Sequence, residues 1–177
     1  MIKLEHAQQR FWYHDAMKTC ILAAGGTFDK HYNPLSGTLE FGQSHLPEIL
    51  INARLHGDIR LEVVMQIDSL DMQDNHRAQL YDRCKAVPED CIVIVHGTDT
   101  MTNTAEILGR AGLKKVVVIT GAMVPYAIEK SDAQTNLGFA LGCAPLLPVG
   151  VYIAMNGAVH PWDKVRKNRT LGLFESI

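Results

Sequence analysis

Residues 91–100, CIVIVHGTDT, contain an apolar run that passes directly into a short polar loop. The run shows no alternation between apolar and polar residues, which is typical of a strand covered on both faces in a parallel sheet. A segment with helical periodicity, residues 102–111, follows the loop. The stretch therefore predicts a strand, a loop and a helix in succession, the repeating unit of an α/β fold.

The same pattern recurs along the chain. Apolar runs bounded by turn-forming residues predict five strands, at residues 18–24, 60–67, 91–96, 116–120 and 149–155. Helical periodicity between these runs predicts four helices, at residues 45–55, 72–85, 102–111 and 132–141. Because strands and helices alternate, we predict a three-layer α/β/α fold with a mostly parallel sheet.

The length of 177 residues suits one domain with a sizeable core. We expect that domain over residues 19–177. Residues 1–18 precede the first strand without a place in the pattern and form an N-terminal extension. Residues 29–42, DKHYNPLSGTLEFG, are rich in turn formers and long for a strand-to-helix connection, which is common for lids and binding loops.

Composition excludes several classes of protein. With 47% hydrophobic and 20% charged residues, the chain matches a globular protein rather than a disordered one. The net charge of −2 argues against nucleic acid or an anionic membrane as a partner. No apolar run reaches the roughly eighteen residues of a membrane-spanning helix, and residues 1–18 lack the apolar block of a signal peptide. We therefore expect a cytoplasmic protein.

The spacing of cysteine and histidine predicts neither a metal nor a cofactor. The eight histidines show no HxxH or HExxH pattern. Two of the cysteines lie in apolar runs, where a buried inert thiol is expected. None of the four forms a CxxC pair: Cys20, Cys84, Cys91 and Cys143.

Small and polar residues follow the predicted strands. In an open parallel sheet, ligands bind beyond the carboxyl ends of the strands, so these residues are expected to meet at one edge. They are Gly25, Gly26 and Thr27 after the first strand, Ser69 after the second, Thr98 and Asp99 after the third, and Lys164 and Lys167 beyond the fifth.

Each of these features also has a purely structural interpretation. The double glycine suits a tight turn, and a phosphate-binding loop would need a GxGxxG or GxxxxGK spacing that is absent. The remaining alternatives are a helix cap at Ser69 or Asp71, a capping box at Asn103 and Glu106 with Thr98 and Asp99 shaping the helix entrance, and a solvated basic face over residues 164–169.

Together the same residues provide the groups needed for acyl transfer. A threonine hydroxyl is a weak nucleophile and needs a base or proton relay within hydrogen-bond reach. A desolvated lysine can take that proton through a second hydroxyl such as that of Thr98, while Asp99 orients the group. Backbone N–H groups after Thr27 or Thr98 are suited to stabilise an oxyanion.

Six motifs then resemble, in order, those of the bacterial-type L-asparaginase family: AAGGTF, DSLDM, HGTDTM, GAMVP, SDAQTNL and MNGAVHP with the following KNRT. The resemblance runs from about Thr19 to the last residue and concerns the family's N-terminal domain. It implies a mixed-sheet α/β fold. It also implies hydrolysis of an amino-acid side-chain amide to the acid and ammonia through a covalent acyl-enzyme, with asparagine or a related small amide as substrate.

The resemblance assigns a role to individual residues. Thr27 matches the nucleophile, and Tyr32 matches the tyrosine that assists it. Thr98, Asp99 and Lys167 match a second catalytic group, in which threonine and lysine activate the nucleophile or water and aspartate holds the substrate α-amino group. Ser69 matches the serine that binds the α-carboxylate. The implied substrate-binding residues are Ser69, Asp99, Gly26, Gly97 and Ala122.

Two departures from the family pattern affect the expected function. Leu70 stands where the family usually has a second polar residue that binds a charged amino-acid head group. The sequence also ends soon after Lys167, where the family continues into a second domain that completes a neighbouring subunit's site. We therefore expect a homodimer or tetramer, with the site near a subunit boundary. The alternative is a non-catalytic amino-acid-binding or regulatory relic of the family.

Overall fold

A six-stranded sheet forms the centre of the computed structural model, which describes residues 18–55 and 57–177. The predicted extension over residues 1–18 therefore lies, apart from Lys18, outside the described residues. The strand order is β4-β1-β5-β6-β7-β8, parallel except for the pairing of β8 with β7. The strands are β1 (Thr19–Gly25), β4 (Ile59–Ile67), β5 (Cys91–Val95), β6 (Val116–Thr120), β7 (Gly150–Met155) and β8 (Ala158–Pro161).

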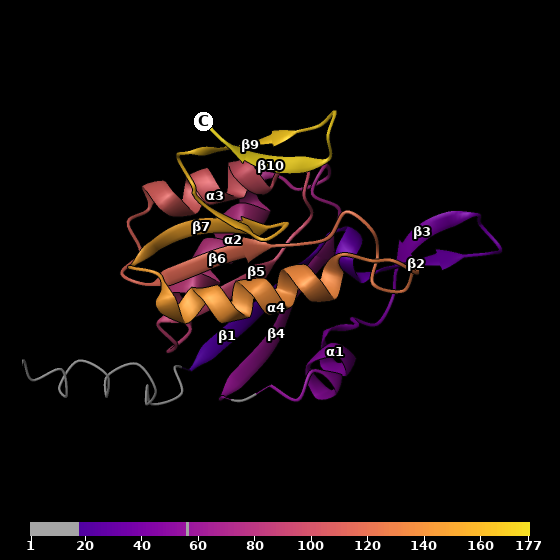
Figure 1. The fold of residues 1–177 in the computed structure, drawn as a ribbon, viewed down its shortest axis with the longest axis horizontal. Coiled ribbons are helices and arrows are strands. Elements are labelled where there is room, and N and C mark those ends of the chain that lie inside the picture. Colours follow the sequence, from indigo (N-terminus) through magenta and orange to yellow (C-terminus); the bar gives the residue numbers. More distant parts are fainter. Residues whose placement is uncertain (1–17, 56) are drawn as a thin grey trace, which may run out of the picture.

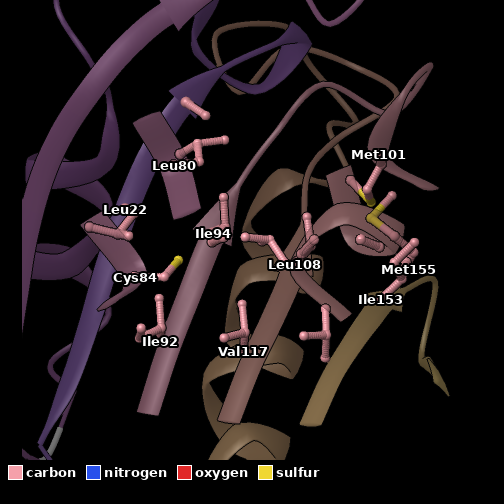
Figure 2. Packing of buried hydrophobic residues seen from close by; sticks show 14 of the residues in the cluster. Leu22, Leu80, Cys84, Ile92, Ile94, Met101, Leu108, Val117, Ile153 and Met155 are labelled. Carbon is pink, nitrogen blue, oxygen red and sulfur yellow. The ribbon is translucent and has the colours of Figure 1, made fainter. Parts of the chain in front are cut away.

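Helices cover both faces of the sheet, as Figure 1 shows. The helices α2 (Asp74–Ala86) and α3 (Met101–Arg110) lie on one face, and α1 (Leu46–Asn52) and α4 (Ala133–Cys143) lie on the other. Along β5, Ile92 and Ile94 pack toward α2 and α3, as Figure 2 shows, whereas Val93 and Val95 pack toward α1 and α4. Burial on both faces explains the continuous apolar runs, and the three-layer α/β/α prediction is confirmed.

Most predicted element bounds agree with the structure to within two residues. The exception is α1, for which the periodicity predicts an end at residue 55 whereas the helix ends at Asn52. The backbone of Arg54 adopts φ +46°, which a right-handed helix does not accommodate. No helix in the described ranges is both long and apolar enough to cross a membrane.

Two short hairpins flank the sheet. Residues predicted as a long connection form β2 (Lys30–Asn33) and β3 (Thr38–Phe41), which project away from the sheet (Figure 1). Near the C-terminus, β9 (Val165–Asn168) and β10 (Leu173–Ser176) pair with each other and form a hairpin beside one end of α3. A single turn of 3-10 helix, η1 (Thr27–Asp29), joins β1 to β2, and another, η2 (Ala144–Leu146), follows α4.

His96, the residue after β5, ties the end of that strand to α3. Its side chain is fully buried, with Nδ1 2.7 Å from the Gly97 carbonyl oxygen and Nε2 2.8 Å from the Thr104 hydroxyl. Because the carbonyl can only accept, Nδ1 carries the hydrogen and Nε2 accepts from Thr104. Burial lowers the pKa of His96 to about 4 from an ordinary 6.5, so the neutral ring is retained in the fold.

We expect the buried neutral His96 to make stability depend on pH. Its pKa is depressed in the folded protein, so below pH 6.5 the unfolded chain binds the extra proton and folding weakens. The loss should be about 1.5 kcal/mol between pH 6.5 and pH 5. Hydrogen bonds from Arg60 lower the pKa of Glu89 to about 2 from an ordinary 4.5. Protonation of this carboxylate therefore weakens folding mainly below pH 4.5, outside the window from pH 6.5 to pH 5.

Urea unfolding at pH 7, 6 and 5 measures this slope. His96→Asn should be less stable at pH 7 and should lack the loss between pH 6.5 and pH 5. His31→Asn, which removes a histidine of the hairpin strand β2, serves as the control and should retain the wild-type slope. An unchanged slope in His96→Asn would contradict the assignment.

Candidate active site

Three turns at the carboxyl edge of the sheet touch through their backbones. A Cβ atom added to Gly26 would lie 2.3 Å from Cα and N of Gly97, and one added to Gly97 would lie 2.7 Å from Cβ and Oγ of Ser69. Gly26 also has φ +82°, a conformation that favours glycine. The residues that follow these glycines, Thr27 and Thr98, therefore belong to adjoining turns.

Thr27 is the partly exposed residue of an otherwise buried turn. Gly25, Gly26, Phe28 and Asp29 on either side of it are all buried. The turn is held on several sides: Gly26 N donates to the Ile67 carbonyl at 3.0 Å, Tyr126 N donates to the Phe28 carbonyl at 3.1 Å, and the Asp29 carboxylate accepts from Ser44 Oγ at 2.7 Å and His45 N at 3.0 Å. A fixed turn that exposes one hydroxyl is suited to present a nucleophile.

An ion pair connects the Thr27 turn to the turn that carries Ser69. The amine of Lys30 contacts the carboxylate of Asp68, and both side chains are largely buried. Burial alone raises the pKa of Asp68, but the hydrogen bonds from Lys30 and from Leu70 N outweigh it and hold the pKa below its ordinary value. Asp68 is therefore a charged anchor between the loops after β1 and β4.

The amine of Lys167 reaches the end of β5. It donates to Thr98 Oγ1 at 2.8 Å and to Asp99 Oδ1 at 2.9 Å, and its side chain is 12% exposed. The hydroxyl of Thr98 in turn donates to Met123 Sδ at 3.5 Å. Because a thioether sulfur is a weak acceptor, the hydroxyl can readily donate to another acceptor instead. Threonine, lysine and aspartate thus form one hydrogen-bonded group beside the Thr27 turn.

The hairpin of β9 and β10 positions Lys167. Val165 and Phe174, on its two strands, are buried in the same core cluster as residues of α3, and Trp162 packs against that cluster. Lys167 pairs in register with Phe174. The hairpin therefore fixes the backbone from which the amine of Lys167 extends to Thr98.

Arg169 joins the same group. Its Nη1 donates to Asp99 Oδ1 at 3.2 Å and its Nη2 to the Asp99 carbonyl at 3.3 Å. Together with Lys30 and Asp68, it is a contributor that sequence reasoning missed. Arg169 follows the last residue of β9 and lies in the turn of the hairpin, so strand alternation does not place it beside Lys167 and the sequence carries no local signal for it.

The capping alternatives for Ser69, Asp71 and Asn103 do not hold. The helix α2 is capped by Gln73 in a capping box with His76, and α3 begins after Thr100. The Thr100 hydroxyl instead donates to the Ser69 carbonyl at 2.6 Å and accepts from the buried Arg77. Ser69 itself is 2% exposed beside Gly97.

Ala122 and Tyr32 lie apart from the hydrogen-bonded group. Ala122 is buried in the core cluster on the α1 and α4 face. The backbone N–H groups of the next two residues, Met123 and Val124, donate to the carboxylate of Asp132. Tyr32 on β2 is 58% exposed, and within the described part of the chain no hydrogen bond joins it to Thr27. The role of Tyr32 therefore stays a prediction.

The described residues offer no group of three or more His, Cys, Asp or Glu side chains suited to hold a metal ion. The groups available for chemistry at this edge are hydroxyls, two amines, a guanidinium and carboxylates.

Comparison with known proteins identifies the family of the chain. The model of the asparaginase N-terminal domain matches residues 18–176. L-asparaginase 1 of Escherichia coli K12 is 32% identical over 161 residues, which cover 81% of this chain and 45% of that protein. A probable periplasmic L-asparaginase of Haemophilus influenzae is 32% identical over 169 residues, which cover 88% of this chain and 48% of that protein.

The fold agrees with solved structures as well. The thermostable L-asparaginase of Thermococcus kodakarensis superimposes with a TM-score of 0.81 at 29% identity, covering 91% of this chain and 51% of that one. The chain thus spans about half the length of such relatives, and the matched half carries the motifs around Thr27, Ser69, Thr98 and Lys167. The chain belongs to the asparaginase family and corresponds to its N-terminal domain.

Proposed function

We propose that the protein is an amidohydrolase that converts asparagine or a related small amide to the acid and ammonia. The observation that carries the proposal is the contact of Lys167 Nζ with Thr98 Oγ1 at 2.8 Å, beside the turn that exposes Thr27. Membership of the asparaginase family supports the same chemistry.

In the first half of the reaction, Thr27 Oγ1 attacks the carbonyl carbon of the amide. The hydroxyl proton passes through Thr98 to Lys167, which acts as the base, and the carbonyl oxygen becomes an oxyanion. Backbone N–H groups of the adjoining turns stabilise that oxyanion. The C–N bond then breaks, the departing nitrogen takes the proton, and ammonia leaves an ester on Thr27.

In the second half, water attacks the carbonyl carbon of the ester. The Thr98–Lys167 pair accepts the water proton, and the C–O bond to Thr27 breaks. The proton returns to Thr27 Oγ1, and the free acid leaves. Asp99 holds the amine of Lys167 in place through their contact at 2.9 Å.

Substrate contacts are proposed for the residues at the touching turns. We propose Ser69, Asp99 and the backbone of Gly26 and Gly97 as contacts there, and the backbone of Ala122 as a further contact on the loop after β6. Tyr32 assists Thr27 when the hairpin of β2 and β3 brings it near.

We also infer that the protein works in the cytoplasm, since its four cysteines are free thiols.

Replacing the nucleophile is the first test of the proposed function. Thr27→Ala should lower ammonia release from asparagine and succinamate by roughly a thousandfold, because no other hydroxyl forms the ester. The circular dichroism spectrum should stay unchanged, since Thr27 is not a core residue. Thr135→Ala, an exposed position on α4, is the control and should keep wild-type turnover.

Residual activity above a tenth of wild type in Thr27→Ala would exclude Thr27 as nucleophile. If wild type released no ammonia from any small amide, the non-catalytic binding alternative would replace the proposed function.

The second test concerns the coupling of Thr98 and Lys167. If they move one proton as a unit, Thr98→Val and Lys167→Met should each reduce kcat by at least about a hundredfold, and the double variant should be little worse than either. A double variant whose loss equals the product of the two single losses would show that the residues act independently.

We further propose that the protein is a homodimer or tetramer, with the site near a subunit boundary. Several apolar side chains are exposed on the two hairpins and on loops that follow strands of the sheet, and exposed apolar surface often marks interfaces. They are Tyr32, Leu35 and Leu39 on the hairpin, Leu70 after β4, Ile128 after β6 and Leu171 between β9 and β10.

Light scattering at micromolar concentration measures the assembly. Wild type should show twice or four times the monomer mass, and Leu70→Asp should lower it, because Leu70 is 66% exposed at the site edge. Leu146→Asp, in the turn after α4 where this leucine is 78% exposed, should leave the mass unchanged. A clean monomer that still hydrolyses an amide would contradict a site completed by a neighbouring subunit.

A further inference from the structure

The carboxylate of Asp29 is buried two residues after Thr27. Asp29 is the last residue of η1, the single helical turn that begins with Thr27, and it is 0% exposed. Among the described residues its partners are two neutral donors rather than a cation: Oδ2 accepts from Ser44 Oγ at 2.7 Å, and Oδ1 accepts from His45 N at 3.0 Å. Burying a carboxylate is costly unless hydrogen-bond donors replace its water. The shape of η1 therefore depends on these two bonds.

The two donors lie on the far side of the hairpin of β2 and β3. Asp29 immediately precedes β2, whereas Ser44 and His45 follow β3 and lead directly into α1. One carboxylate thus joins the two ends of the hairpin and ties η1 to the start of α1. That start is well supported, because Leu46, the first residue of α1, is fully buried in the same core cluster as Phe28.

The side chain of Thr27 takes its direction from the backbone of η1. Within the described residues the Thr27 hydroxyl has no hydrogen-bond partner. The other supports of the turn hold its first two residues, through Gly26 N and the Phe28 carbonyl, but the end of the turn is held by Asp29. Because a displacement of about 1 Å at a reacting group can cost about a hundredfold in rate, the support at Asp29 matters for the direction of the hydroxyl.

We propose that Asp29 is a positioning residue for Thr27, on the basis of the proposed amidohydrolase function. By holding the end of η1 against the start of α1, its carboxylate fixes the direction in which Thr27 Oγ1 points toward the amide carbon. Asp29 is 0% exposed, so it acts through Thr27 and not by contact with the substrate. This role requires two hydrogen bonds and not a charge, so an amide of the same shape should replace the carboxylate.

The kinetics of ammonia release from asparagine test this role. Asp29→Ala should lower kcat about tenfold and leave KM within about twofold of wild type, because the nucleophile is displaced while the proposed substrate contacts lie on other turns. Asp29→Asn keeps an acceptor for His45 N and gains a donor to Ser44 Oγ, so its kcat should stay within about threefold of wild type.

Glu89→Ala is the matched control for a loss of stability. Glu89 carries another buried carboxylate, but it pairs with Arg60 and precedes β5, at the edge of the sheet opposite to the site. The variant should unfold at a lower urea concentration than wild type and keep the wild-type kcat.

The methyl group of Thr27 provides a readout that does not require turnover. Its order parameter, measured by NMR on methyl-labelled threonine, should fall in Asp29→Ala and keep the wild-type value in Asp29→Asn and Glu89→Ala. Ser44→Ala removes one of the two donors and should lower both kcat and the order parameter, though less than Asp29→Ala. It carries the test if Asp29→Ala does not fold.

Several results would overturn the proposal: a wild-type kcat in Asp29→Ala or, where that variant does not fold, in Ser44→Ala; a rise in KM alone; an unchanged order parameter; or an equal loss of kcat in Glu89→Ala. A loss in Asp29→Asn as large as that in Asp29→Ala would also overturn it, because the charge would then be required. Reduced order at Thr27 in Asp29→Ala, with no ammonia release by wild type, would uphold the positioning by Asp29 and refute the hydrolytic function instead.

Discussion

Bare backbone at Gly26 and Gly97 lets the turns after β1, β4 and β5 touch, and the rest of the site depends on that contact. A side chain at either glycine would need space already filled by the next turn. With the turns in contact, Thr27 and Thr98 each follow one of the two touching glycines, and Ser69 lies against Gly97. The remaining groups attach to this centre: Lys30 and Asp68 join two of the turns, and His96 holds the Gly97 carbonyl from within the core.

The layered fold could be predicted from the sequence because burial on both faces leaves a direct trace. Strands such as Val116–Thr120 consist almost entirely of apolar residues, since helices cover them above and below. The hairpins could not be predicted in the same way. The strands β2 and β9 are four residues long and mostly exposed or half-buried, so neither alternation nor continuous hydrophobicity marks them. The end of α1 depends on the backbone of Arg54, for which the sequence offers no turn signal.

Part of the candidate site was also accessible to sequence reasoning. Residues that directly follow buried parallel strands must share one edge, which places Thr27, Ser69 and Thr98 together without knowledge of any distance. The cations could not be placed by this rule, because Lys167 and Arg169 arrive on a hairpin whose path depends on Val165 and Phe174 entering the core. The pairing of Lys30 with Asp68 joins residues far apart in the chain and has no local sequence signature.

The central claim is that the touching turns present Thr27 as the acylated residue. Rapid acid quenching of the protein with an excess of amide, followed by mass spectrometry of its peptides, locates the acyl group directly. We predict an acyl adduct on Thr27 in wild type that decays as the acid is formed, and no adduct in Thr27→Ala. An adduct on Thr98, or steady turnover with no adduct on either threonine, would contradict the account.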